Sequence, residues 1–212
     1  LTFIQDSGIP ILGINTGRLG FLANVAKTEI NDAVTALFEK KYSIQKRSML
    51  SVSSPKELFG EVNYGLNELT VLKKDSSSMI TIHAYINGDF LNSYFADGLI
   101  VATPTGSTAY SLSCGGPLIM PGSQNFVITP IAPHNLNVRP FVISDNNIIT
   151  LKVEGRSKNY LVSLDSRTQT IDSSIEITIK KADFYLNLIQ LENQSFFDTM
   201  RKKLLWGLDK RN

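Results

Sequence analysis

The chain has 212 residues, of which 42% are hydrophobic and 19% are charged, a balance typical of a globular protein with a real core. Its 21 basic against 19 acidic residues leave a net charge of +2, too little for the basic surface of a nucleic-acid-binding protein. No apolar run approaches the ~20 residues of a membrane span. The single cysteine, Cys114, excludes an internal disulfide and favours a reducing, cytoplasmic setting. One cysteine and two distant histidines, His83 and His134, predict no metal site.

The first part of the chain predicts an α/β layer. Leu1–Asp6 resembles the end of a helix, and residues 9–14 form a nearly continuous apolar run, typical of a strand buried on both faces. Apolar residues then recur at helical spacing from Ile30 to Phe38. A chain that opens in this way predicts that residues 1–41 are the remainder of an N-terminal α/β domain.

From Tyr42 onward the hydrophobic period changes from helix to strand. Alternating segments follow one another, and Asn87-Gly88 between two of them predicts a type I′ hairpin. We therefore expect an all-β domain over residues 42–190. Residues 191–212 predict a C-terminal helix, for which Ser195 and Asp198 form a capping-box pattern.

Residues 96–117 carry the densest functional signal. Leu99–Ala102 predicts a short buried strand, and the turn after it ends in Gly106, which can take a positive φ. Ser107 or Thr108 is then the expected N-cap of a short helix. A loop of this kind directs hydroxyls and backbone N–H groups toward one place, where phosphates, ribose hydroxyls or the edge of a base would bind.

Asn67 and Glu68 are a second candidate pair. An amide beside a carboxylate can hold a ribose or an adenine through donor and acceptor pairs. Neighbouring residues of a strand face opposite sides unless a bulge or strand end intervenes, so a surface acid next to a strand-end amide is the alternative.

Taken together, these segments resemble the NAD kinase family. The resemblance rests on the Asp-Gly-Leu and Thr-Pro-Thr-Gly-Ser-Thr-Ala-Tyr-Ser motifs within residues 97–117, on residues 13–22, on the Asn67–Glu68 pair, and on Ala-Pro-His at 132–134. It implies an α/β N-terminal remnant followed by a mainly antiparallel all-β domain, as in NAD kinases and diacylglycerol kinases. The C-terminal helix would return to the N-terminal domain.

The resemblance also implies a reaction. ATP would donate a phosphoryl group to the adenosine 2′-hydroxyl of NAD, giving NADP, with magnesium or another divalent metal bridging the donor phosphates. Asn67 and Glu68 would contact the substrate nucleoside, Asp97 would lie near the nicotinamide amide, and Phe21 would lie over the nucleotide site. The other NAD-binding positions implied are Thr105, Thr108, Ala109, Tyr110 and Ser113. NAD and ATP would be the partners of a cytoplasmic homo-oligomer, a tetramer or a dimer.

The chain departs from the family pattern at two places. The Gly-Gly-Asp-Gly motif, whose Asp is the candidate base, occurs nowhere in the sequence, so no catalytic residue is assigned here and we expect that Asp upstream. At 165–167 the chain has Asp-Ser-Arg where NAD kinases commonly have Asp-Gly-Gln. Two alternatives stay open: a lipid kinase of the diacylglycerol or sphingosine type, and a nucleotide-binding module without catalysis.

Overall fold

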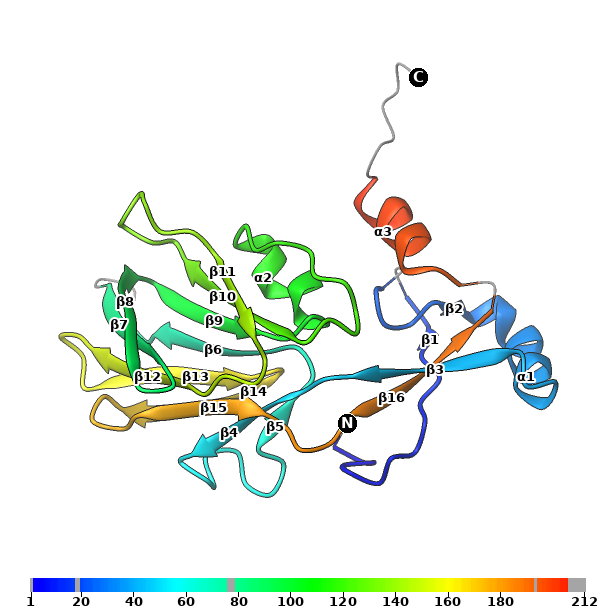
Figure 1. Ribbon diagram of the computed structural model, residues 1–212, viewed down its shortest axis with the longest axis horizontal. Coiled ribbons are helices and arrows are strands. Elements are labelled where there is room, and N and C mark those ends of the chain that lie inside the picture. The colour runs from blue at the N-terminus through cyan, green and yellow to red at the C-terminus, as the bar shows by residue number, and fades with distance from the viewer. Residues whose placement is uncertain (1, 18–19, 76–78, 193, 206–212) are drawn as a thin grey trace, which may run out of the picture. The chain divides into compact units, whose positions relative to one another are not determined.

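The computed structural model describes residues 2–17, 20–75, 79–192 and 194–205. The chain divides into two compact units, which are considered separately (Figure 1). The first, called the β unit, comprises Leu1–Asp6 and Arg47–Leu186, and the second, called the α/β unit, comprises Ser7–Lys46 and Asn187–Asn212. The division into domains at 41 and 190 stays a prediction.

The β unit is built on two six-stranded sheets in which all neighbouring strands are antiparallel. The first sheet has the order β11-β10-β9-β6-β13-β14, and its strands are Phe141–Ser144, Asn125–Ile131, Gly98–Ala102, Glu68–Lys73, Asn159–Leu164 and Arg167–Asp172. The second has the order β5-β4-β15-β12-β7-β8, and its strands are Tyr64–Gly65, Leu50–Ser54, Ile177–Lys181, Ile149–Glu154, Ile80–Ile86 and Asp89–Ala96.

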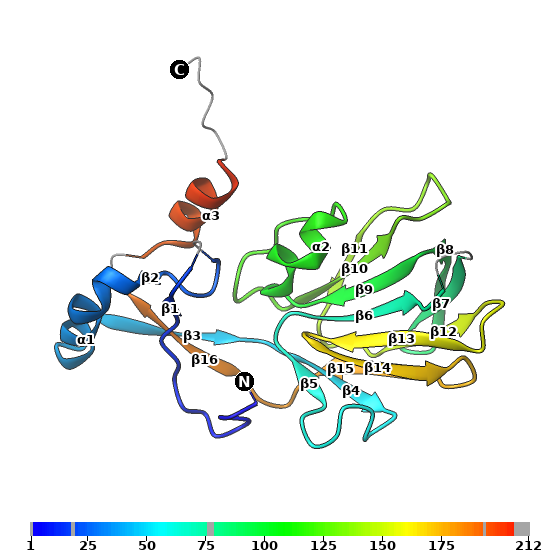
Figure 2. The ribbon, with the colours of Figure 1, turned by 180° about the vertical axis from the view of Figure 1, so that it is seen from behind.

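The two sheets pack face to face over one hydrophobic core, to which β9 contributes Leu99 and Val101. The other face of β9 is also covered, because Ile100 and Ala102 join a second cluster with Ile119. That cover includes the segment around the short helix α2 (Tyr110–Ser113), which lies over β9 and β10 (Figure 2). All five residues of β9 are therefore buried, as its uninterrupted apolar run predicts.

The hairpin between β7 and β8 has the type of turn that the sequence predicts. Asn87 has φ 53° and Gly88 has φ 89°, the two positive values that a type I′ turn requires, and they join β7 to β8. Together with the antiparallel sheets, this confirms the predicted fold class.

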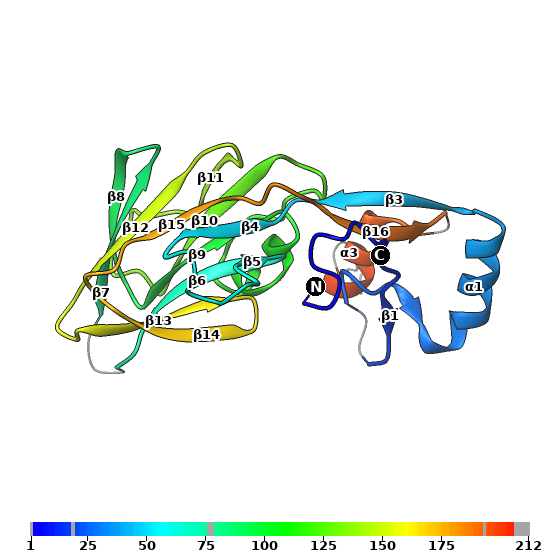
Figure 3. The ribbon, with the colours of Figure 1, turned by 90° about the horizontal axis from the view of Figure 1, so that it is seen from below.

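The α/β unit is small. It contains the parallel pair β1 (Ile14–Asn15) and β2 (Val25–Ala26). It also contains most of the two-stranded sheet of β3 (Tyr42–Arg47) and β16 (Leu186–Leu191), which lie side by side in Figure 3. Its helical elements are the 3₁₀ turn η1 (Lys27–Glu29), α1 (Ile30–Phe38) and α3 (Phe196–Leu204). None of the helices in the described ranges has the length and apolar character needed to span a membrane.

Two predictions for this region are wrong. Leu1–Asp6 forms turns, in the part that the structure describes, rather than the end of a helix. Residues 9–14 form no continuous buried strand: Ile11 makes an isolated bridge to Leu188, only the last residue enters β1, and Ile9 is 57% exposed. An apolar run is buried on both faces only where layers cover both sides, and the described unit does not provide them.

The C-terminal helix forms as predicted, but its capping box does not. Ser195 occupies the N-cap in an extended conformation without a side-chain cap bond. Its carbonyl instead accepts from the backbone N–H and the hydroxyl of Thr199, at 3.1 and 3.0 Å. Asp198 pairs with Arg201 one turn later, which leaves it unavailable to close the box.

Candidate functional site

Three segments that are distant in the sequence meet where three inner strands of the first sheet, β6, β9 and β13, begin or end. The start of β6 pairs with the end of β9 through Glu68 and Ala102, and with the end of β13 through Leu69 and Leu164. The turn between β13 and β14 begins at Asp165. Strand register therefore brings the Asn67–Glu68 pair, the loop after β9 and the β13–β14 turn together.

Asp165 holds the backbone at the start of β6. Its Oδ2 accepts from the N–H of Leu66 at 2.8 Å, and its Oδ1 accepts from the N–H groups of Asn67 at 2.8 Å and Glu68 at 3.2 Å. Its own N–H donates to the Glu68 carbonyl at 3.0 Å. Asp165 has φ 53°, a left-handed conformation that Asp tolerates better than most residues. One turn residue thus fixes three consecutive residues of another strand.

The loop after β9 fixes the same stretch from its other side. The Thr103 N–H donates to the Asn67 carbonyl at 2.9 Å, and the Thr103 hydroxyl donates to the Leu66 carbonyl at 2.5 Å. With Asp165, these bonds occupy every backbone N–H and carbonyl of Leu66, Asn67 and Glu68. A stretch whose backbone is this fully bonded holds its side chains in a defined orientation.

The side chains of the pair, in contrast, are unpartnered within the described residues. No hydrogen bond forms at the Asn67 amide, and Glu68 Oε2 is buried without a partner. Burial first, and then the negative charge of Asp165, raise the pKa of Glu68 to about 7. A buried carboxyl without a partner is costly in a resting protein, and such groups concentrate at functional sites.

Gly106 is needed here for a different reason from the one predicted. It has no positive φ, which corrects that expectation, and it opens the 3₁₀ turn η2 (Gly106–Thr108). A Cβ at Gly106 would stand 2.8 Å from the Asn67 Cα and still closer to the carbonyl group of that residue. The loop can therefore close on Asn67 only because residue 106 has no side chain.

The Ser107 and Thr108 hydroxyls form hydrogen bonds within their own loop, so the prediction that one of them is an N-cap is wrong. Ser107 and Thr108 lie inside η2, and the residue before α2 is Ala109, which makes no side-chain cap bond. The Ser107 hydroxyl donates to Pro104 O at 2.7 Å and accepts from the Ile119 N–H at 3.0 Å. The Thr108 hydroxyl donates to the Thr105 carbonyl at 3.0 Å.

The remaining loop positions differ in exposure. Thr105 is buried, Thr108 and Ala109 are half-buried, and Tyr110 and Ser113 are exposed. Of the predicted positions in this loop, the last two are therefore the most accessible to a ligand.

Asp97 lies at the opposite end of β9 from Thr103. At ~3.3 Å per residue, the five residues of β9 place these ends roughly 16 Å apart. Asp97 Oδ1 forms an ion pair with Lys73 Nζ at 2.6 Å. Burial first, then Cys114 and the charge of Asp97, raise the pKa of the Tyr110 hydroxyl. The predicted residues of the β unit thus fall into a Glu68 group and an Asp97 group.

Phe21 belongs to the α/β unit. Its ring lies 6.3 Å from that of Phe196, and Lys203 Nζ lies 5.4 Å from its centroid. Its location over a nucleotide stays a prediction.

Sequence reasoning missed the residues that organise the site. Thr103 and Asp165 carry the bonds just described, and the Arg167 guanidinium donates to the carbonyls of Val62 and of Tyr64, the latter at 2.6 Å. The available signal was an acidic residue at the tip of a predicted turn, followed two residues later by an arginine. Nothing in the sequence tells which distant backbone such residues reach.

No group of three or more His, Cys, Asp or Glu side chains that could hold a metal ion occurs within the described ranges. The oxygens of Asp165 are already taken up by backbone N–H groups. The described side chains therefore do not form a magnesium cage by themselves.

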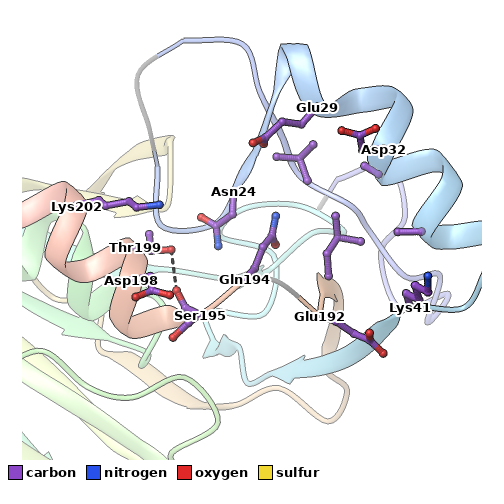
Figure 4. Close-up of a pocket in the computed structure, with 14 residues that line it drawn as sticks. Asn24, Glu29, Asp32, Lys41, Glu192, Gln194, Ser195, Asp198, Thr199 and Lys202 are labelled. Carbon is purple, nitrogen blue, oxygen red and sulfur yellow. Dashed lines mark hydrogen bonds between the residues drawn. The ribbon is translucent and has the colours of Figure 1, made fainter.

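A cavity of about 500 Å³ lies in the α/β unit, and none of the predicted site residues is among those that line it. Glu29 and Asp32 border it on one side, and Asp198, Thr199 and Lys202 of α3 border it on the other (Figure 4). Its walls mix both signs of charge, so its composition favours no single ligand class.

Comparisons with known proteins identify relatives of this chain. The family model described as the ATP-NAD kinase C-terminal domain matches residues 66–191, and the one described as the ATP-NAD kinase N-terminal domain matches residues 1–42. The NAD kinase of Cytophaga hutchinsonii is 53% identical over 211 residues, and that of Flavobacterium psychrophilum is 56% identical over 213. In both cases the alignment covers 100% of this chain and 72% of the relative.

Two solved structures have a similar fold. The NAD kinase of Archaeoglobus fulgidus in complex with ATP aligns with a TM-score of 0.78 and 30% identity, over 92% of this chain and 74% of that one. Yeast NADH kinase complexed with NADH aligns with a TM-score of 0.84 and 23% identity, over 94% of this chain and 61% of that one. This chain therefore spans less than two thirds of the yeast enzyme.

Proposed function

Because this chain belongs to the NAD kinase family, we propose that Leu66–Glu68 and the loop Thr105–Ser113 hold the NAD on which it acts. The reaction is the transfer of a phosphoryl group from ATP to the adenosine 2′-hydroxyl of NAD, which gives NADP. In such a transfer the protein mainly positions the reactants and stabilises charge. The relatives reported above are all NAD or NADH kinases, which leaves the lipid-kinase and non-catalytic alternatives without support.

One observation carries the proposed site. The backbone of Leu66–Glu68 is fully bonded, while the Asn67 amide and Glu68 Oε2 find no partner among the described residues. An amide and a carboxyl held in this way match the hydroxyls of a ribose and the ring nitrogens of an adenine. Asn67 and Glu68 are thus the groups that would orient the acceptor hydroxyl.

The other roles extend from this pair. Thr105, Thr108 and Ala109 would build the wall beside the nucleoside. Tyr110 and Ser113 would face the ligand, and Asp97 would lie near the nicotinamide amide. Phe21, in the α/β unit, stays a predicted NAD-binding residue.

Several features of the whole enzyme belong to the same proposal. The general base would be the Asp of a Gly-Gly-Asp-Gly motif, which these 212 residues do not contain. Magnesium or another divalent ion would arrive on the phosphates of ATP, since the described side chains form no cage for it, and no step here depends on it. The enzyme would be a cytoplasmic homo-oligomer, a dimer or a tetramer.

The test is an NADP-formation assay with ATP and magnesium on the full-length gene product, comparing Asn67→Ala with Asn146→Ala. Asn146 is an exposed amide in the turn between β11 and β12 and is not one of the proposed site residues, which makes it a matched control. We expect Asn67→Ala to lower kcat/KM for NAD at least tenfold and Asn146→Ala to leave it unchanged. Equal rates in the two variants would contradict the proposed site.

A further inference from the structure

Two carboxyl groups meet at this site, and the protein supplies only one of them with partners. The Asp165 carboxylate accepts three backbone N–H groups at 2.8, 2.8 and 3.2 Å. Glu68 Oε2 is buried with no donor among the described residues, and the Glu68 N–H nitrogen lies 3.2 Å from Asp165 Oδ1.

Among the described residues, no positively charged group lowers the pKa of Glu68. The segment Thr103–Gly106, which closes over Asn67, contains no charged residue. Arg167, on β14, directs its guanidinium to the carbonyls of Val62 and Tyr64. Burial and the like charge of Asp165 act in the same direction and raise the pKa of Glu68 to about 7.

We propose that Asp165 is a positioning residue for NAD binding: it fixes the backbone of Leu66–Glu68 and, by its charge, keeps the Glu68 carboxyl protonated when NAD binds. This inference rests on the proposed function, because it assigns a protonation state to a residue of the proposed NAD site. A protonated carboxyl both donates and accepts a hydrogen bond, whereas a carboxylate only accepts. The protonated form therefore pairs with a nucleoside group that offers a lone pair, such as an adenine ring nitrogen.

Proton-linked binding has a measurable consequence. If only the protonated form of Glu68 binds NAD well, affinity falls as pH rises through the titration range of this group, by up to tenfold per pH unit above it. Replacing Asp165 by Asn removes the charge and keeps one oxygen, which can still accept from Asn67 and Glu68. The midpoint of the affinity profile then moves to lower pH, by about one unit.

The experiment is calorimetric titration of the full-length protein with NAD between pH 5.5 and 8.5. The variants are Asp165→Asn, Glu68→Gln, and Asp89→Asn as a control, since Asp89 is an exposed acid at the start of β8. We expect the wild type and Asp89→Asn to lose affinity above about pH 7 and Asp165→Asn to lose it from a lower pH. Glu68→Gln should bind within about threefold of the wild-type affinity at low pH, without pH dependence.

Each of the following results would overturn the inference. One is an Asp165→Asn profile with the wild-type midpoint, because a merely structural residue lowers affinity equally at every pH. Another is a Glu68 carboxyl that titrates near 4.5 in the carbon NMR spectrum of the wild type, a measurement that needs no variant to fold. A flat wild-type profile with binding lost in Glu68→Ala would overturn this inference alone, whereas full binding by Glu68→Ala would overturn the proposed site as well.

Discussion

One carboxyl group of the candidate site lies near each end of β9, and the two groups differ in burial and in their partners. At one end, Asp97 is about a third exposed and pairs with Lys73 Nζ at 2.6 Å. At the other, Glu68 on the neighbouring strand has a buried oxygen without a partner and a pKa raised to about 7. The Asp97 carboxylate therefore has a partner in the absence of a ligand, whereas burial of the unpartnered Glu68 carboxyl costs free energy until a ligand binds.

This difference indicates how much each end of the site contributes to NAD affinity. An exposed ion pair contributes little to stability and can open when a ligand arrives. A buried carboxyl held by a fully bonded backbone is preorganised, and its desolvation cost is already met when NAD binds. We therefore expect the Glu68 end to provide most of the affinity and the Asp97 end to adjust it.

The largest expected effect comes from Gly106→Val, which breaks the Glu68 end. A side chain at this position overlaps the Asn67 carbonyl group, so the loop and the start of β6 must separate. We expect a stability loss of about 3 kcal/mol and no detectable NAD binding. Urea unfolding and calorimetry measure the two effects.

Gly17→Val is the matched control, because a Cβ at Gly17 meets nothing within 4 Å. If Gly106→Val were as stable as this control and bound NAD normally, close contact of the loop with Asn67 would not be needed.

A smaller effect is the pH dependence of stability. The folded pKa of Glu68 is about 7 against an ordinary value of 4.5, so its contribution is fully favourable below 4.5 and is lost as pH rises to about 7. We expect unfolding at pH 8 in Glu68→Gln to require more free energy than in the wild type, on the order of 1 kcal/mol, with little difference at pH 4.5. Urea unfolding at both pH values measures this, and an identical difference at both would show that Glu68 has an ordinary pKa.

The smallest expected effect comes from Lys73→Met, which removes the ion pair with Asp97. Removing the cation from a partly exposed pair costs about 0.5 kcal/mol, and the NAD affinity should change by less than threefold. Thermal unfolding and calorimetry test this. A loss of affinity as large as that of a Glu68 variant would mean that the two ends contribute equally.

The sequence predicts the β unit better than the α/β unit, for a physical reason. Strands such as Leu99–Ala102 and the Asn87-Gly88 turn depend on local apolar pattern and backbone preference, which adjacent residues determine. The exposure of Ile9 depends instead on which layers cover it, and its own neighbours do not encode that. Phe38, 85% exposed at the end of α1, illustrates the same limit.

Within the candidate site, the sequence points to the Asn67–Glu68 pair, whose contact with NAD stays a proposal, but not to the residues that hold its backbone. Asn67 and Glu68 form a visible polar pair in an apolar run. Asp165 and Thr103 act on them from about 100 and 35 residues away, through a strand register that no local pattern specifies. The hydroxyls of Ser107 and Thr108 look like ligand contacts in the sequence, yet they bond their own loop.

The most direct test of the account is the NAD affinity of Glu68→Ala beside that of Glu61→Ala, measured by calorimetry on the full-length protein at pH 6.5. Glu61 is an exposed acid a few residues before the site, so both variants remove one carboxyl from the same region. We predict that Glu68→Ala lowers the NAD affinity at least tenfold, about 1.4 kcal/mol, and that Glu61→Ala does not change it, with both proteins folded. Equal affinity in the two variants would contradict it.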